Sequence, residues 1–213
     1  MALQVTGQSQ GILTASQKSG APAAINTGWH NEWLKSDLLA RYAYMNLNGS
    51  VFGVGYAAAA LAAPSATQAG AFTLYNPSGS GKNLVLLEIT TALTTFTAIA
   101  TTVCAIGVYT FSNQTPTTLT GGNAPLCALV GAGNLSVAKT YTAATIVGGN
   151  TFPIRQVSNM GVLTAVGVAD VITKDEVAGA LIVAPGSGFG LAATATAADD
   201  TIQVTYTWAE LPI

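Results

Sequence analysis

The residues that could do chemistry are few and lie far apart in the sequence. The 213-residue chain has one histidine, His30, and two cysteines, Cys104 and Cys127. A Ser-His-Asp or Cys-His mechanism needs a histidine beside its nucleophile, and His30 is distant in sequence from both cysteines. We therefore interpret His30 as a surface or interface residue. Each cysteine lies in an apolar context without metal-ligand spacing, which indicates two buried thiols and leaves their pairing open.

One segment, Ser78-Gly79-Ser80-Gly81-Lys82, resembles a phosphate-binding loop at first sight. A P-loop has a further glycine five residues before the glycine of its Gly-Lys pair, and a serine or threonine after the lysine. Asn76 and Asn83 occupy those two positions here. The segment also precedes a predicted strand instead of a helix, so we interpret it as a turn.

Paired carboxylates could serve glycoside cleavage or bind a cation. The candidates all fall in predicted turns with polar neighbours, where a solvated carboxylate is the ordinary role: Asp170, Asp175, Glu176, Asp199 and Asp200. We therefore expect no catalytic residue, no cofactor and no metal, and hence a protein that is not an enzyme.

The composition argues against a nucleic-acid-binding protein and against a membrane-spanning protein. Charged residues make up 8% of the chain, against roughly 25% in an average globular domain. The seven basic residues are scattered singly, whereas phosphate backbones are bound by clusters, so we expect no nucleic-acid partner. The densest apolar run, residues 51–63, is too short and too rich in glycine to span a membrane. The first ten residues have no basic and no apolar signal region, so we expect synthesis in a cytoplasm without secretion.

From about residue 66 the pattern predicts an antiparallel β-sandwich, with a jelly roll fitting the number of strands. The last strand is the clearest, because Ile202, Val204, Tyr206 and Trp208 alternate with polar residues. We expect these four side chains to face the core. Further strands are predicted at 71–75, 83–91, 102–111, 126–130, 141–147, 162–168, 180–184 and 189–195.

Residues 1–65 are predicted to form a separate region, an extended arm with one amphipathic helix at about 29–45. Apolar residues recur there at near-helical spacing, and the aromatic and leucine side chains of one face are interface candidates: Trp29, Trp33, Leu34, Leu38 and Tyr42. Two alternatives stay open for this face. It packs on the chain's own β-domain, or it docks on a neighbouring subunit.

The β-region resembles small head proteins of tailed bacteriophages, of the capsid decoration or cement type. The resemblance rests on the turn Asn76–Asn83 leading into Leu84-Val85-Leu86, on Ile182–Gly186 before a strand, and on the ending Val204–Glu210. It covers about residues 70–213. The resemblance implies a β-sandwich on the outer surface of the virion capsid, made in the host cytoplasm and contacting the major capsid protein.

The resemblance also implies a homotrimer. The sequence itself argues only for association, because no charged residue occurs from 42 to 81 or from 89 to 138, and large uncharged faces are rarely left exposed on monomers. We thus expect a virion structural protein that binds shell subunits through its arm and β-domain. The alternative is a receptor- or glycan-binding surface module, such as an adhesin or fibre-like protein.

Overall fold

A computed structural model describes residues 25–26, 33–34, 42–61, 67–95, 104–147, 149–150, 152–160, 172–193 and 197–213. The chain divides into two compact units, Met1–Leu47 and Asn48–Ile213. The boundary lies earlier than residue 65, the expected end of the arm. Residues 48–65 include two strands of the β-unit, so part of the segment that the sequence assigned to the arm belongs to the sandwich.

The first unit contains short elements only. Strand β1 (Ile25–Asn26) pairs antiparallel with β2 (Trp33–Leu34), and helix α2 covers Ala43–Leu47. The continuous helix expected over 29–45 is therefore wrong at two described points. Trp33 and Leu34 are in a strand, and Tyr42 has a φ of +66°, which an α-helix does not accommodate. A helix of this length is marginal without tertiary packing, and tryptophan is also well suited to strands.

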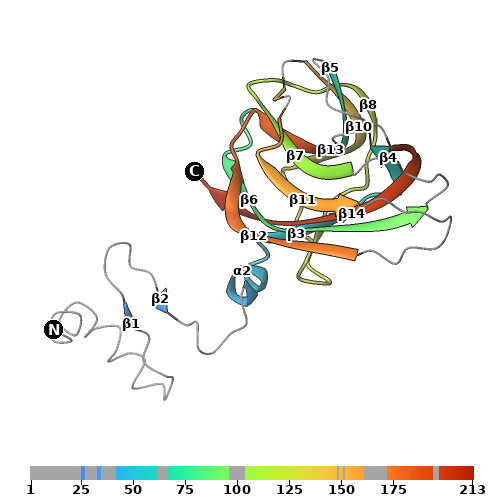
Figure 1. The fold of residues 1–213 in the computed structure, drawn as a ribbon. Helices are drawn as coiled ribbons and strands as arrows, with labels where there is room; N and C mark the ends of the chain where they lie inside the picture. The colour runs from blue at the N-terminus through green and yellow to red at the C-terminus, as the bar shows by residue number, and fades with distance from the viewer. Residues whose placement is uncertain are drawn as a thin grey trace. The chain divides into compact units, whose positions relative to one another are not determined.

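Residues 48–213 form an antiparallel β-sandwich, as expected, with two six-stranded layers lying one above the other (Figure 1). Its strands are β3 (Val51–Gly55), β4 (Ala59–Leu61), β5 (Thr67–Asn76), β6 (Lys82–Thr95), β7 (Cys104–Ser112), β8 (Thr117–Gly121), β9 (Leu126–Cys127), β10 (Lys139–Val147), β11 (Arg155–Met160), β12 (Ile172–Val183), β13 (Ser187–Ala193) and β14 (Ala197–Pro212).

The strand order is consistent with a jelly roll. One sheet runs β11-β7-β13-β5-β10-β8, and the other runs β12-β6-β14-β3-β9, with β4 also pairing with β14. Counted 1 to 8 along the chain, strands β3, β5, β6, β7, β11, β12, β13 and β14 are ordered 1-8-3-6 and 2-7-4-5. Strands β8, β9 and β10 are then an insertion between the fourth and fifth strands, and they extend both sheets beyond β5 and β3.

Several strands differ from the sequence prediction. Strands β8 and β11 were missed, and of the expected strand 126–130 only Leu126 and Cys127 pair. The strand predicted at 162–168 lies outside the described residues. Strand β3 was missed because its two glycines weaken the pattern; pairing with β14 and burial of Phe52 and Val54 supply what the local sequence lacks.

The core lies between the two sheets, and β14 contributes its centre. Ile202, Val204, Tyr206 and Trp208 are at most 2% exposed, which confirms the inward face predicted from their alternation. The aromatic rings pack edge to face within and across the layers. Between ring centroids, Tyr206 lies 5.0 Å from Phe189 of the facing sheet and 5.4 Å from Tyr56 of its own sheet. The sandwich therefore closes around an aromatic cluster drawn from both sheets.

Strand β5 is irregular where it faces this cluster. Its register with β13 shifts by one residue, and Phe72 has a φ of +56°, a rare conformation for a bulky side chain. Two buried tyrosines of the facing layer donate to its carbonyl oxygens, Tyr206 to Phe72 at 2.9 Å and Tyr56 to Thr73 at 3.0 Å. Burial raises the pKa of both tyrosines well above 10.0, so both hydroxyls stay protonated and remain donors.

A second aromatic layer covers the outer side of the β5 sheet. Gly188 of β13 lies directly between Tyr75 of β5 and Phe111 of β7 in the strand register. The two rings lean together over the glycine, with centroids 6.1 Å apart and an interplanar angle of 20°. A Cβ at Gly188 would lie 2.6 Å from the carbonyl oxygen of Leu74 and closer still to the Phe111 ring. The close fit explains a glycine in the middle of a central strand.

The two sheets are also joined along the edge formed by β11 and β12. Arg155 on β11 donates two hydrogen bonds to the Asp175 carboxylate on β12, at 2.6 and 2.7 Å, and Ser158 lies 3.2 Å from Thr173 between hydroxyl oxygens. The pKa of the Arg155 guanidinium is raised by these hydrogen bonds. The bidentate pair fixes the separation of the two edge strands.

We predict that Tyr206→Phe lowers the free energy of unfolding by about 1–3 kcal/mol, because it leaves the buried Phe72 carbonyl without its donor.

Stability of the parent protein should also fall as the pH rises above about 10, since the unfolded tyrosines ionise first while the folded ones resist ionisation. In Tyr56→Phe/Tyr206→Phe this alkaline loss should be smaller. Urea unfolding from pH 7 to 11 measures both effects, with the exposed Tyr44→Phe as control; equal curves for all variants would contradict the assignment.

Gly188→Ala should lower the free energy of unfolding by roughly 1–3 kcal/mol, because the added methyl overpacks the aromatic layer. Gly121→Ala is the matched control, also in a strand but with no atom near the new Cβ. Thermal or urea unfolding of the two variants should separate them clearly. Equal stability of the two variants would contradict the close fit around Gly188.

Candidate interaction surface

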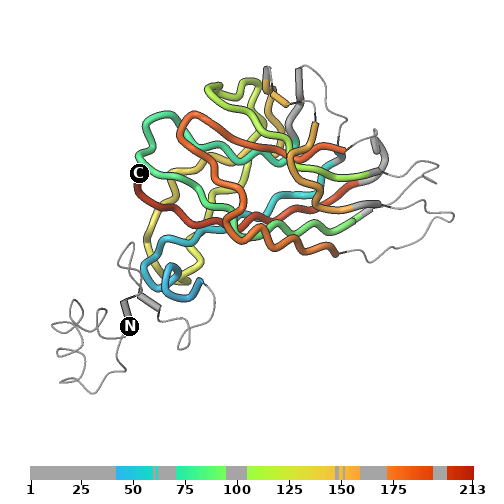
Figure 2. The backbone as a smooth tube through the Cα atoms, turned by 60° about the vertical axis from the view of Figure 1, so that its left-hand side comes forward, coloured from blue at the N-terminus to red at the C-terminus, as the bar shows by residue number. Residues whose placement is uncertain are grey.

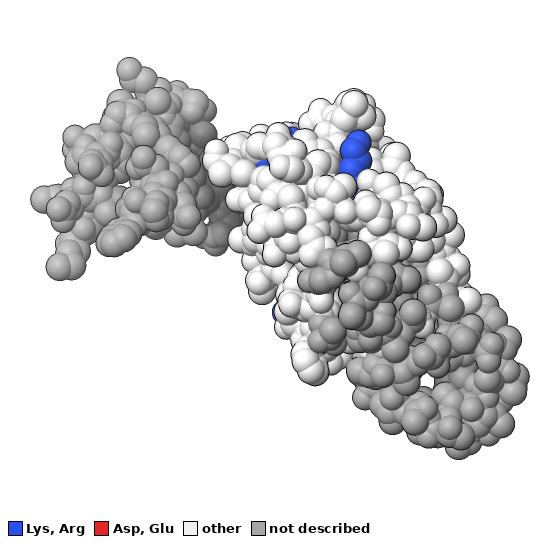
Figure 3. Space-filling model, turned by 90° about the horizontal axis from the view of Figure 1, so that it is seen from above, with Lys and Arg blue, Asp and Glu red and all other residues white. Residues whose placement is uncertain are grey.

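The β-unit presents very little free charge. Most of its described charged side chains are held in intramolecular ion pairs: Lys82 with Glu210, Arg155 with Asp175, and Lys174 with Glu88 and Glu176. Seen from above, the described surface is almost entirely uncharged, with a few Lys or Arg atoms and no Asp or Glu (Figure 3). An interaction of this face with a partner must therefore depend on shape, apolar contact and neutral hydrogen bonds.

The interface residues predicted from the first unit are only partly described. Trp29 and Leu38 lie outside the described residues, as does His30. Trp33 and Leu34 are paired in β2, and Tyr42 is half-buried before α2. The described residues among these five do not share one helical face. Their role in an interface stays a prediction.

The groups considered for chemistry are dispersed. Cys127 is a free, half-buried thiol, and the side chain of Cys104 is outside the described set. The prediction that the paired carboxylates lie in turns is wrong for Asp175 and Glu176, which are in β12, and for Asp199 and Asp200, whose backbone is in β14. Strand β12 is an edge strand, where alternate residues reach solvent and charges are tolerated. Asp170 is not described.

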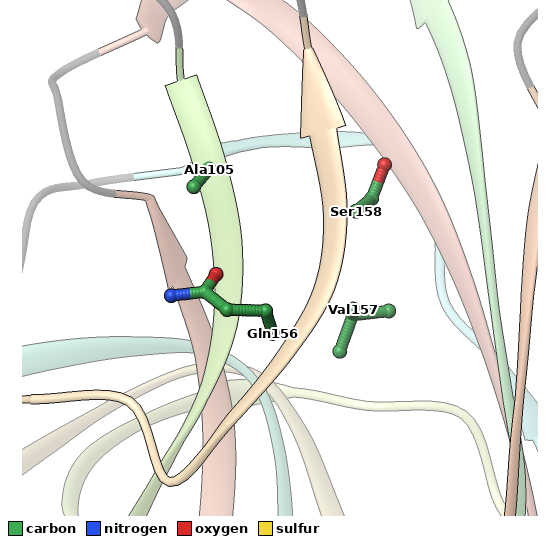
Figure 4. Close-up of a pocket in the computed structure, with 4 residues that line it drawn as sticks. All are labelled: Ala105, Gln156, Val157 and Ser158. Carbon is green, nitrogen blue, oxygen red and sulfur yellow. The ribbon is translucent and has the colours of Figure 1, made fainter.

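A shallow pocket of about 300 Å³ lies along β7 and β11, lined by Ala105, Gln156, Val157 and Ser158 (Figure 4). Its lining offers one amide and one hydroxyl, and the Ser158 hydroxyl is already bonded to Thr173. In the described part of the chain, no three His, Cys, Asp or Glu side chains gather as a metal site would require. These features do not define a small-molecule site.

The insertion between β7 and β11, residues 113–154, is the most distinctive surface of the β-unit. Its one charged residue is Lys139, and strand β8 is exposed along its whole length. Half-exposed to fully exposed large apolar side chains follow one another along it: Leu119, Leu126, Val130, Leu135, Phe152 and Ile154. Single exposed leucines are common, but a series of them on one element with a single charged residue makes it a candidate interaction surface.

Residues 128–138, which we term the return loop, display two of these side chains, Val130 and Leu135, and Leu126 lies just before the loop. The loop begins where Leu126 and Cys127 pair with β3, and the amide of Ala128 donates to Val51 at 2.8 Å. Further along, the Asn134 side chain donates to the Gly49 carbonyl at 3.0 Å. Val130, between these two anchor points, is 95% exposed, and Leu126 and Leu135, just outside them, are 73% and 85% exposed.

The return loop ends on a buried carboxylate. Glu210, whose side chain is fully buried, accepts hydrogen bonds from the Ser136 hydroxyl at 2.5 Å and the Val137 amide at 2.9 Å. Its other oxygen accepts from Lys82 at 3.0 Å. The loop, the start of β6 and the end of β14 therefore meet at one point.

The three segments that carry the sequence resemblance converge at this end of the sandwich. Asn76 donates from its side chain to Lys82 at 2.8 Å and to Val183 at 2.9 Å, and its carbonyl accepts from Gly186 at 2.8 Å. Figure 2 shows the C-terminus beside the turn between β5 and β6, where Ile213 bonds to Gly81. These motifs are thus joined in one packed corner, next to the return loop.

Sequence reasoning missed the return loop as a surface, although one signal was present. The uncharged stretch from 89 to 138 predicted association, and it includes the return loop. Which part of it lies outside the core could not be read from composition, because buried strands and exposed apolar loops both lack charge.

No described helix has the length and apolar character needed to cross a membrane. Comparison with family models, with curated proteins and with solved structures gives no match for this chain.

Proposed function

We propose that the chain is a structural protein of a virion, which decorates or cements the capsid of a tailed bacteriophage by binding shell subunits. The observation that carries the proposal is the insertion, an element with one charged residue, Lys139, and several exposed apolar side chains on an otherwise well-packed sandwich. Jelly rolls also occur in lectins and cupins, so the strand order alone favours no single function. The surface favours permanent contact with another protein.

The internal pairing of charges supports the same proposal. A protein that binds its partner by electrostatic steering keeps charges free on its surface. Here the ion pairs join strands of the same chain, as Arg155 with Asp175 and Lys82 with Glu210 do. Contacts in an assembled shell are made once and last, so fast steered encounter is of less value than fit.

The decisive experiment is the stoichiometry of this chain in purified particles, measured against the major capsid protein. A fixed ratio that persists through washing is the expected result. Binding of the isolated protein to glycans or cells, without incorporation into particles, would instead support the receptor-binding alternative.

Leu135→Asp should weaken association with shells by at least about tenfold, because a charge placed in an apolar contact leaves an unpaired, desolvated carboxylate. The matched control is Ile172→Asp, which changes an equally apolar side chain, 67% exposed on β12 and outside the insertion. Co-sedimentation with shells, at several protein concentrations, measures the difference. Equal binding of the two variants would exclude the insertion as the contact surface.

We further propose that the chain forms a homotrimer and that the first unit, with Trp29, Trp33, Leu34, Leu38 and Tyr42, contributes to association. Light scattering should then give three times the 21.5 kDa of one chain. Deleting residues 1–47 should leave the β-unit folded, because its sheets and core lie within 48–213. The deleted protein should lose its oligomer or its binding to particles. A monomeric mass for the full chain, or unchanged assembly after deletion, would contradict this role.

A further inference from the structure

Glu210 is the most completely buried charged side chain of the described ion pairs, and it does more than pair with Lys82. The Glu210 side chain is 0% exposed, whereas Lys82 is 35% exposed. One carboxylate oxygen accepts from the Ser136 hydroxyl, from the Val137 amide and, at 3.5 Å, from the Trp208 indole. Two of these three donors belong to the return loop.

The remaining anchors of the loop precede Ser136 in the sequence. Ala128 and Asn134 bond to residues 49–51, at the start of the β-unit. Between Asn134 and β10, the described hydrogen bonds from the loop to another segment are those to Glu210. Ser136 also accepts from the amide of Ala138, which shapes the turn locally. The path of the chain after Leu135 thus depends on this carboxylate together with the packing of Val137 and Ala138 on the core.

A buried carboxylate enforces such closure strongly. An ionised carboxylate without donors is expensive to bury, and each hydrogen bond to it is stronger than a neutral one. If the return loop opened, Glu210 would lose the Ser136 and Val137 donors while the β14 ladder still held it under Trp208. Opening is therefore opposed by the loss of two hydrogen bonds to a charged acceptor.

We propose that Glu210 is the positioning residue of the interaction surface: its carboxylate holds the end of the return loop closed and so keeps Leu135 in the arrangement that a neighbouring subunit binds. This inference rests on the proposed function, since it specifies how the same surface is kept ready for assembly. Glu210 does not contact the partner; it acts through the loop, and the partner is a shell subunit that offers an apolar, uncharged contact.

The test compares Glu210→Gln with Glu88→Gln in the full chain. Both variants remove one charge from a lysine pair, but Glu88 bonds to Lys174 on the exterior of the sheet and has no contact with the loop. Amide hydrogen exchange is measured at Val137 and, as reference, at Tyr206 in the centre of β14. Shell binding is measured in parallel.

For Glu210→Gln we expect exchange at Val137 to rise by at least about tenfold, exchange at Tyr206 to change much less, and shell binding to weaken by at least about fivefold. Glu88→Gln should match the parent protein in all three. A uniform rise at Val137 and Tyr206 would show a merely structural role and overturn the inference, as would unchanged exchange at Val137.

Ser136→Ala provides a second route if Glu210→Gln fails to fold, because it retains the carboxylate, Lys82 and Trp208 and removes one loop donor. It should raise exchange at Val137 and weaken shell binding, each to a smaller degree. Leu135→Asp separates the two levels of the argument. If that variant binds shells normally, the insertion is not the contact surface; if it loses binding while Glu210→Gln and Ser136→Ala retain it, only the positioning role fails. If the parent protein itself does not bind shells, the proposed function fails.

Discussion

The sandwich depends on the satisfaction of two core-facing carbonyls in strand β5. The register shift at Phe72 places irregular backbone against the aromatic cluster, where an unpaired carbonyl would be strongly unfavourable. Two tyrosines of the facing sheet supply the donors: Tyr206 lies in β14, and Tyr56 directly follows β3. Their rings fill the space between the layers while their hydroxyls fix the layer separation. The same two side chains therefore fill the core and satisfy its buried carbonyls. Because hydrogen bonds need a defined length, these two bonds set the separation of the sheets.

Charge is used in this molecule to join strands. Arg155 with Asp175 connects the two sheets at one edge, and Lys82 with Glu210 connects the start of β6 to the end of β14. With most charges engaged in this way, the insertion between β7 and β11 has one charged residue, Lys139, and its exposed apolar side chains are the strongest feature of its exterior. The intramolecular ion pairs thus both stabilise the corner around Glu210 and leave the surface with few free charges.

The sequence predicted the all-β class and the inward face of β14, because strict alternation over eight residues has few other readings. It missed the division at Leu47, since β3 has weak local propensity and becomes a strand only when β14 lies beside it. The helix expected at 29–45 followed a real apolar periodicity, but Tyr42 and the pairing of Trp33 interrupt it. The return loop could not be foreseen, because its anchors, Gly49 and Glu210, are brought together only by the sheet topology.

Strand β14 lies in the middle of its sheet, between β6 and β3, although it follows both of them in the sequence. On the ribosome, β3 and β6 therefore emerge before the strand that will occupy their inner edges. The sheet can close only after β14 has left the exit tunnel, so folding of the β-unit is dominated by contacts distant in sequence. Until then β3 and β6 expose open edges, which are templates for unwanted pairing.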